Sequence, residues 1–204
     1  IKILMNSIMA REGKAKVLTE SEFKRLLVIA KNGKHAIRNV AMIYCSYGLG
    51  LRAKEIASLS IKDICDPNFQ LLDEINLRRF MTKGEKQRTV YLSNKKIREA
   101  LQAHLHFLKE QFKPQVRPLF ETQKNQRFSP DTLQKWFIDL YDKAGIYGAS
   151  SHSGRRTFIT RLIEHGADIK AVSKLAGHAS IMTTAIYVED NPERLKKISD
   201  LAIF

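Results

Sequence analysis

The chain has 204 residues, with 35 lysines and arginines against 21 aspartates and glutamates, so its formal net charge is +14. Hydrophobic residues make up 44% of it, which is enough for a folded core and excludes a wholly disordered chain. No apolar run approaches the roughly 20 residues of a membrane-spanning helix, and residues 1–5 are too short for a secretory signal. The positive charge favours a polyanionic partner, but charge alone does not separate a binder from an enzyme.

The start of the chain differs from the rest. Residues 1–17 are basic and weakly patterned, so we predict an N-terminal arm or the remnant of an interdomain linker, followed by one folded domain over 18–204. Because the sequence opens on Ile1, a fragment of a longer protein is favoured.

Helices are predicted for the first quarter of the chain. Thr19 and Glu22 form a capping-box pattern that starts one helix, and the Asn-Gly pair at 32–33 ends it. A second helix is predicted over about 34–47, and a short third helix begins near Arg52, after the glycines at 48 and 50. The apolar residues of the second helix expected to face the core are Ile37, Val40, Ala41 and Tyr44.

The hydrophobic period changes in the middle of the chain. Alternating residues over 71–77 and 88–92 predict two antiparallel strands, joined by a hairpin turn at 82–86. Ser93 is then expected to cap a helix that runs to about residue 112, and the Ser-Pro pair at 129–130 to open another.

Short helical segments, punctuated by Gly166 and Gly177, are predicted after Ser151. A last helix is expected over 191–204, with Leu195, Ile198 and Leu201 on one face. The predicted fold class is α+β, mostly α-helical with a small antiparallel β-sheet. Two cysteines without metal-ligand or redox spacing are expected to be reduced core thiols of a cytoplasmic protein: Cys45 and Cys65.

Several polar residues stand out by their surroundings, although each has an ordinary explanation when taken alone. Arg52 follows a glycine-flanked turn, where it can simply pair with Glu55, and a turn lysine such as Lys83 is usually solvated. His152 and Arg155 are three residues apart and share a helix face, a spacing that is common by chance. The full set is Arg52, Lys83, His152, Arg155, His178 and Tyr187.

Together these residue types can break a phosphodiester without water or metal. A tyrosine oxygen can attack phosphorus and stay bonded to it, and each arginine can hold two phosphate oxygens without losing its charge. Lysine or histidine can pass a proton to the departing sugar hydroxyl. The sequence offers no competing cluster of carboxylates.

In this order, the segments that carry these residues resemble the tyrosine recombinase (phage integrase) family. Residues 48–56 resemble its first arginine box, and 82–92 resemble the β-hairpin that carries its lysine. Residues 151–158 resemble its His-x-x-Arg box, and 175–187 its last box, which ends in the nucleophile. Three positions depart from the usual pattern, and they affect packing rather than charged groups: Gly154, Arg156 and Ala176.

The resemblance implies the tyrosine recombinase catalytic-domain fold and a role for each site residue. Arg52 and Arg155 would bind the scissile phosphate, and Tyr187 would form a 3′-phosphotyrosyl bond. Lys83 would protonate the leaving 5′ oxygen, a role for which Lys86 on the same turn is the rival. His152 would assist proton transfer, His178 would hydrogen-bond the phosphate, and Glu55 would orient the site. No metal or other cofactor is expected, because side chains supply the positive charge.

Charge is densest between Arg78 and Arg98, where eight basic residues accompany one acidic residue. Basic side chains such as these can contact DNA phosphates, and phosphate contacts position a protein on DNA without reading the DNA sequence. The residues expected to contact the DNA backbone are Arg78, Arg79, Lys86, Arg88 and Arg156.

The resemblance also implies partners. We expect double-stranded DNA, a homotetramer on paired DNA sites, a monomer away from DNA, and a tail helix that docks on a neighbouring subunit or on its own domain. The source is expected to be bacterial, archaeal or a mobile element, with the protein associated with the nucleoid. The predicted function is that of a site-specific DNA recombinase (integrase), which cleaves and rejoins strands in DNA integration, excision or inversion. A topoisomerase IB-like relaxing enzyme and a non-catalytic DNA-binding accessory protein stay open as alternatives.

Overall fold

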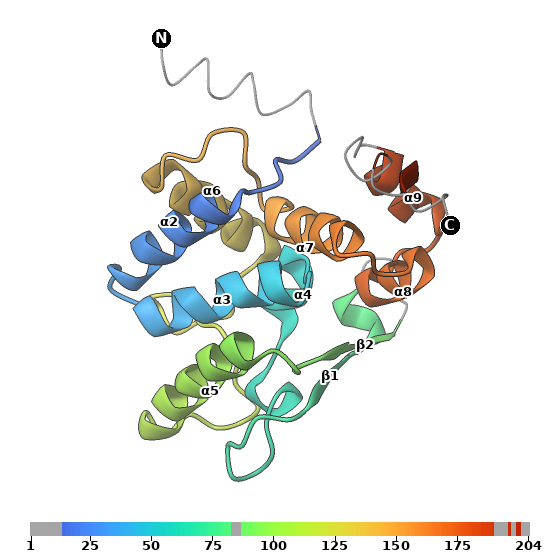
Figure 1. Ribbon diagram of the computed structural model, residues 1–204. Helices are drawn as coiled ribbons and strands as arrows, with labels where there is room; N and C mark the ends of the chain where they lie inside the picture. The colour runs from blue at the N-terminus through green and yellow to red at the C-terminus, as the bar shows by residue number, and fades with distance from the viewer. Residues whose placement is uncertain (1–13, 83–86, 190–195, 197–198, 201–204) are drawn as a thin grey trace.

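Helices form most of the described chain, which comprises residues 14–82, 87–189, 196 and 199–200 of this computed structural model (Figure 1). A two-stranded antiparallel sheet, β1–β2, completes the fold, which confirms the predicted class. The elements in chain order are α2 (Glu20–Lys31), α3 (Ala36–Gly48), α4 (Ala53–Ser58), η1 (Ile61–Asp63), β1 (Glu74–Leu77), η2 (Arg79–Met81), β2 (Arg88–Tyr91), α5 (Lys95–Glu110), α6 (Pro130–Lys143), α7 (Ser153–Glu164), α8 (Ile169–Ala176) and α9 (Met182–Glu189).

The first two helices confirm most of the sequence prediction. The Thr19 side chain accepts a hydrogen bond from the Glu22 backbone, and the Glu22 carboxylate accepts one from the Thr19 backbone at 3.0 Å, so the capping box is formed. In α3, Ala41 is buried as expected, but the prediction for Ile37 is wrong, because 44% of its surface is exposed. Ile37 lies in the first turn of α3 and lines an open cavity instead of the core.

The link between the strands differs from the predicted tight hairpin. β1 pairs with β2 in the register Ile75↔Val90 and Leu77↔Arg88, but the chain then forms the 3-10 turn η2 instead of reversing at once. Met81 is buried, and this anchors the link to the core. The expected turn residues 83–86 lie outside the described part of the chain.

Helix capping explains where α5 and α6 begin. Asn94, and not Ser93 as predicted, caps α5, because its side chain accepts hydrogen bonds from the backbone of Lys96 and Ile97. Ser129 caps α6 as predicted, with Pro130 in the first turn.

Two clusters of buried side chains hold the helices together. The larger includes Leu26, Ile75 and Phe137, and so joins the helices before α7 to the sheet. The smaller consists of Ile159, Ile163, Val172 and Ala176, against which Tyr187 and Val188 pack. Helix α7 belongs to both regions, since it also packs on α3, and it thus connects α8 and α9 to the rest of the fold (Figure 1).

The cysteines and the tail complete the comparison with the sequence. Cys45 and Cys65 are free and buried, as predicted, and burial raises the pKa of the Cys45 thiol to about 12. Among the helices that the described residues form, none has the length and apolar character needed to cross a membrane. The predicted tail helix over 191–204 lies outside the described residues except at 196, 199 and 200.

Candidate active site

A buried carboxylate lies at the centre of the candidate site. Glu55 is fully buried in α4, and its Oε1 accepts a hydrogen bond from the Arg52 guanidinium at 3.0 Å. Its Oε2 accepts one from the Arg52 backbone at 2.8 Å and another from the Arg88 guanidinium at 2.7 Å. Glu55 therefore orients two arginines at once, and its own charge is compensated by both.

The local sequence explains why Arg52 and Glu55 meet. Arg52 is the residue before the first turn of α4, and Glu55 is the third residue of that helix. At this spacing a carboxylate reaches back to the N–H group of the capping position, as in a capping box. The same carboxylate that completes the helix end thus also holds the Arg52 side chain.

Arg155 is held differently, by carbonyl groups. Its guanidinium is buried in α7 and donates to the Gly50 carbonyl at 2.8 Å and to the Ala176 carbonyl. Burial, and then the charge of Arg52, lower the pKa of Arg155 to about 9, so the guanidinium remains charged at neutral pH. Because both hydrogen-bond acceptors are uncharged carbonyl groups, they do not neutralise the positive charge of Arg155, which can therefore act on an anionic ligand.

A glycine permits the close approach of α7. A Cβ at Gly154 would lie 2.1 Å from Ser46 Oγ and 2.9 Å from Tyr47 Cδ2, both on α3. Helix α7 therefore packs directly on α3, which places the next residue, Arg155, beside Gly50. This contact leaves no room for a larger side chain at Gly154.

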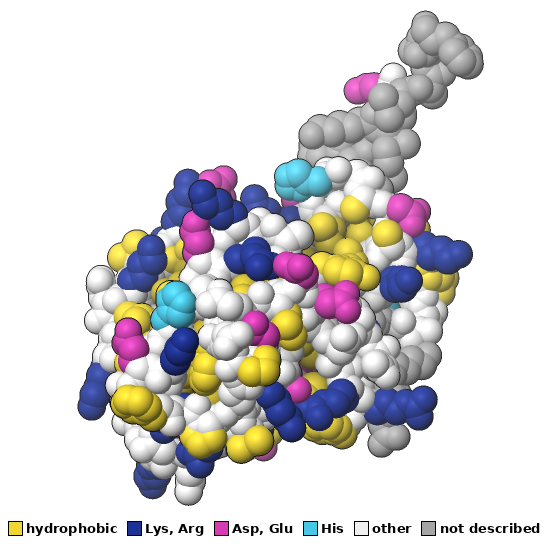
Figure 2. Space-filling model, turned by 90° about the horizontal axis from the view of Figure 1, so that it is seen from below, with side chains coloured by type: hydrophobic (Ala, Val, Ile, Leu, Met, Phe, Trp, Pro, Cys, Tyr) yellow, Lys and Arg dark blue, Asp and Glu magenta, His cyan; other side chains and the backbone are white. Residues whose placement is uncertain are grey.

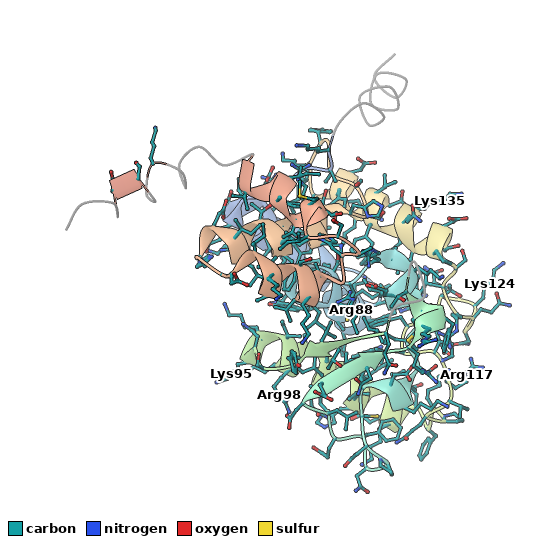
Figure 3. All side chains as sticks on the ribbon, turned by 90° about the vertical axis from the view of Figure 1, so that its right-hand side faces the viewer. Arg88, Lys95, Arg98, Arg117, Lys124 and Lys135 are labelled. Carbon is teal, nitrogen blue, oxygen red and sulfur yellow. The ribbon has the colours of Figure 1, made fainter. Side chains whose placement is uncertain are left out.

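The structure places Arg88 inside the site and not on the surface. Its side chain is 7% exposed and donates to Glu55 and, at 2.6 Å, to the Leu175 carbonyl. The predicted contact of Arg88 with the DNA backbone does not fit this buried position, since both ends of its guanidinium are held inside the protein. In Figure 3 Arg88 lies between the sheet and the helices that follow α6, whereas the other labelled cations lie toward the edge of the view.

His178 and Tyr187 lie next to each other at the end of the chain's last box. Their ring centroids are 6.3 Å apart with an interplanar angle of 17°, and His178 Nδ1 shares a hydrogen bond of 2.7 Å with Thr184 Oγ1. Burial and the charges of Arg155, Arg52 and Arg88 lower the pKa of His178 to about 4. The imidazole is thus neutral at pH 7. The Arg156 guanidinium lies 5.7 Å from the centroid of the half-buried Tyr187 ring.

The remaining predicted site residues lie at the edge of this cluster or outside the described part of the chain. His152 is exposed at the start of α7. Arg78 pairs with Asp63 at 2.7 Å and lies over the Phe80 ring, and Arg79 is exposed. The predicted proton donor and its rival are outside the described residues: Lys83 and Lys86.

Sequence reasoning missed the burial of Arg88 and the part played by Thr184. The strand pattern contains the signal for Arg88, because Arg88, Val90 and Leu92 alternate and the last two are buried. For Thr184, the signal is its position one helical turn before Tyr187, on the same face of α9.

The cluster carries groups that suit a phosphate. Two guanidinium groups, those of Arg52 and Arg88, bond Glu55, and a third, that of Arg155, bonds backbone carbonyls, which leaves an excess of positive charge near Tyr187. Fixed guanidinium groups suit a phosphoryl centre on which negative charge develops. Within the described ranges, no group of three or more His, Cys, Asp or Glu side chains is arranged to hold a metal ion.

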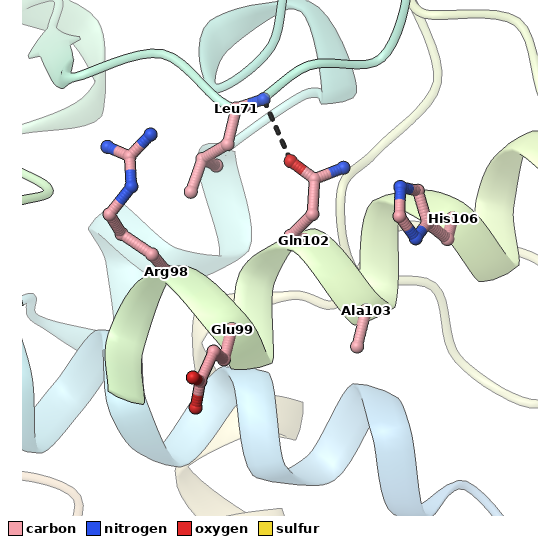
Figure 4. A pocket seen from close by; sticks show the side chains of 6 residues that line it. All are labelled: Leu71, Arg98, Glu99, Gln102, Ala103 and His106. Atoms are coloured by element: carbon pink, nitrogen blue, oxygen red, sulfur yellow. Dashed lines mark hydrogen bonds between the residues drawn. The ribbon is translucent and has the colours of Figure 1, made fainter. Parts of the chain in front are cut away.

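Two cavities lie away from this cluster. One of about 420 Å³ lies on α5, where Gln102 accepts a hydrogen bond from the Leu71 backbone at 3.0 Å (Figure 4). The other, of about 520 Å³, lies between the start of α3 and the end of α5, and is lined by Arg38 and Phe107 among others. Neither is lined by a predicted site residue.

The charged side chains on the surface are arranged differently from the buried arginines of the cluster. Figure 2 shows a face on which lysine and arginine side chains lie among acidic and apolar ones, without a continuous basic surface. Two arginines of the cluster are instead buried, since 7% of the Arg88 side chain and 6% of Arg155 are exposed.

The fold and the site together define a class of protein, namely a helical domain that holds a cluster of arginines beside a tyrosine. The sequence profile of the phage integrase family matches residues 16–194. The tyrosine recombinase XerC of Proteus mirabilis is 33% identical over 183 residues, which cover 89% of this chain and 57% of that protein. The chain belongs to the phage integrase family of tyrosine recombinases, as the sequence boxes predicted.

Solved structures agree with this assignment. The crystal structure of XerA recombinase matches with a TM-score of 0.72 and 29% identity, covering 94% of this chain and 67% of that one. XerH recombinase bound to its difH substrate matches with a TM-score of 0.66 and 26% identity, over 90% of this chain and 53% of that one. This chain spans somewhat more than half the length of the XerC relative. These matches do not favour the topoisomerase-like or the non-catalytic alternative.

Proposed function

We propose that this chain is the catalytic domain of a site-specific DNA recombinase, which cleaves and rejoins strands through a 3′-phosphotyrosyl intermediate. The observation that carries the proposal is the convergence of Arg52 and Arg155 beside the His178–Tyr187 pair. Family membership adds support, since the relatives are named tyrosine recombinases.

The proposed reaction is a transesterification. The Tyr187 oxygen attacks phosphorus, the bond from phosphorus to the 5′ oxygen breaks, and the phosphate stays on the tyrosine. Arg52 and Arg155 bind the non-bridging oxygens and stabilise the phosphorane. Lys83 protonates the leaving 5′ oxygen, and His152 assists proton transfer. Attack by a second DNA end on the phosphotyrosine reverses these bonds and releases Tyr187.

His178 is proposed to hydrogen-bond the phosphate in its neutral form. Its low pKa reflects burial and then the nearby guanidinium groups, and a bound phosphate would offset part of the charge of those groups. The hydrogen bond to Thr184 fixes the ring on the side of Tyr187. Phosphate binding is therefore expected to raise the pKa of His178 and to be coupled to proton uptake below neutral pH.

The proposed partner is double-stranded DNA, which a homotetramer binds on paired sites, and the chain is proposed to be a monomer away from DNA. The XerH relative was solved with its DNA substrate, which supports this partner. Arg78, Arg79 and Arg156, together with Lys86, are proposed to contact the DNA backbone. Residues 18–204 are proposed as the catalytic domain, after an arm or linker over 1–17. The tail at 191–204 is proposed to dock either on a neighbouring subunit or on its own domain.

The decisive experiment is incubation with a nicked suicide duplex, followed by denaturing electrophoresis. The intact chain should form a covalent protein–DNA adduct, and Tyr187→Phe should form none, because the attacking oxygen is missing. Because no metal takes part in the proposed reaction, a chelator should leave the yield unchanged. Absence of an adduct with the intact chain, or its persistence in Tyr187→Phe, would overturn the proposal. Relaxation of plasmids without paired sites would instead indicate the topoisomerase-like reaction.

A further inference from the structure

Arg88 connects segments of the chain that are far apart in sequence. It starts β2, its Nη2 donates to Glu55 Oε2 at 2.7 Å, and its Nη1 donates to the Leu175 carbonyl at 2.6 Å. Glu55 belongs to α4, and Leu175 to the last turn of α8. A single guanidinium thus joins the sheet, the helix that carries Glu55 and the helix end that precedes His178.

The geometry suits arginine and no other side chain. A guanidinium presents donors at fixed angles, so one group can bond a carboxylate and a carbonyl at the same time. A lysine ammonium can keep the charge, but its flexible stem does not fix both partners in one plane. The Arg88 stem also runs across Gly177, where a Cβ would lie 2.3 Å from Arg88 Cδ.

We propose that Arg88 is a positioning residue of the site: through Glu55 it fixes the Arg52 guanidinium, and through Leu175 it fixes the end of α8 before His178. The role rests on the proposed function, since the positioned groups are those that would bind the phosphate. Without Arg88, the Glu55 carboxylate keeps its two hydrogen bonds with Arg52 but loses the bond that ties it to the sheet, so its position is less tightly fixed. The Arg52 guanidinium, which donates to Glu55 Oε1, then moves together with the Glu55 carboxylate.

The first experiment compares Arg88→Lys with the intact chain on the suicide duplex, at saturating DNA and in a single turnover. The cleavage rate should fall on the order of 100-fold, the usual effect of misplacing a reacting group by about 1 Å. Affinity for the duplex should stay within a few-fold, because Arg88 is buried and contacts no DNA in this proposal. The matched control is Lys95→Gln, whose side chain is 89% exposed, and its rate should be unchanged.

A double-mutant cycle separates positioning from a general loss of structure. Glu55→Gln removes the charge through which Arg88 acts on Arg52. In that background Arg88→Lys should lower the rate far less than in the intact chain, because coupled residues are not additive. Equal fold-losses in the two backgrounds would overturn the proposal. So would a loss of DNA affinity as large as the loss of rate, which would indicate a DNA contact.

A readout without DNA keeps this inference apart from the proposed function. With isotope-labelled arginine, the guanidinium NMR signals of Arg52 should shift in Arg88→Lys and stay in place in Lys95→Gln. Unmoved Arg52 signals in a folded Arg88→Lys variant would refute the positioning role, even if the intact chain cleaves DNA. Moved signals in a chain that forms no adduct would support positioning and refute strand transfer.

Discussion

Burial lowers the pKa of both His178 and His104, but the two imidazoles lie in different surroundings. The pKa of His178 is lowered by burial and by three arginines, whereas His104 is buried in α5 with its ring stacked on Phe120 at 5.2 Å. Burial lowers the pKa of His104 to about 4, although its Nε2 hydrogen-bonds the Leu119 carbonyl at 2.8 Å. The first belongs to the candidate site, and the second belongs to the core.

We expect acid to destabilise the protein through His104. Its folded pKa lies below the unfolded value of about 6.5, so the unfolded chain takes up a proton first as the pH falls. Stability is then lost from about pH 6.5 down to about pH 4, by about 3 kcal/mol for the full shift of this group. Urea unfolding across this pH range measures the loss.

The variant His104→Phe should flatten this pH dependence, while costing roughly 1–3 kcal/mol at neutral pH because the Leu119 carbonyl loses its partner. His106→Gln, at an exposed position of the same helix, should leave the pH profile unchanged. Equal slopes in the intact chain and in His104→Phe would show that His104 is not responsible.

The glycine at 177 gives a second prediction for a single residue. Gly177 has φ +64°, and a Cβ there would collide with the Arg88 stem, whereas Gly166 has φ +82° and nothing within 4 Å. Both alanine variants carry the left-handed backbone penalty of roughly 1 kcal/mol. Gly177→Ala should cost roughly 1–3 kcal/mol more, from overpacking, and should slow cleavage. Denaturant unfolding and the adduct assay measure the two effects, and equal stability losses would contradict the collision.

Sequence reasoning is most direct where the signal lies in neighbouring residues of the chain. The boxes predicted Arg52, Arg155 and Tyr187 as site residues, and the structure places Arg155 within electrostatic reach of the other two, while their roles stay a prediction. Sequence reasoning failed for Arg88, because charge alone suggested a surface contact. Burial of that arginine depends on Glu55, which is distant in sequence, and a linear pattern does not show which carboxylate meets which cation.

At the scale of elements, the contact between α3 and α7 sets the position of Arg155. Gly154→Ala would raise helix propensity by about 1 kcal/mol in an open helix. Here the added Cβ meets Ser46 at 2.1 Å, so we expect a net destabilisation of roughly 1–3 kcal/mol and slower adduct formation. Thermal unfolding of Gly154→Ala measures the first effect.

A second change tests the cause. Ser46→Gly removes the two Ser46 atoms that crowd the new Cβ and leaves Tyr47 Cδ2 at 2.9 Å, so it should restore part of the stability when combined with Gly154→Ala. Purely additive losses in the double variant would show that Ser46 is not the obstacle.

Element boundaries show the same division between local and distant causes. The start of α6 at Ser129-Pro130 is a local signal and was predicted. The 3-10 turn after β1 was not predicted, because it depends on Met81 reaching the core. The cap of α5 was placed at Ser93 instead of Asn94, because the choice between them depends on backbone angles.

At the scale of the whole molecule, the charge of +14 divides into a small buried part and a large exposed part. Arg52 and Arg155 are proposed to bind one phosphate, and exposed cations such as Arg78 and Arg79 are proposed to hold the duplex. We expect affinity for duplex DNA to fall steeply between about 50 and 200 mM salt, as counterion release requires. Tyr187→Phe should keep the same salt slope while losing the adduct. Fluorescence anisotropy with a labelled duplex measures the slope, and salt-insensitive binding would refute an electrostatic hold.

The close approach of Arg88 to Gly177 also has an evolutionary consequence. A side chain at 177 and an arginine at 88 exclude each other in space, because the Cβ would occupy the path of the arginine stem. Relatives that carry any other residue at the position of Gly177 are therefore expected to lack arginine at the position of Arg88. The two sites should covary in a family alignment, and a lineage that lost one would be released from selection to keep the other.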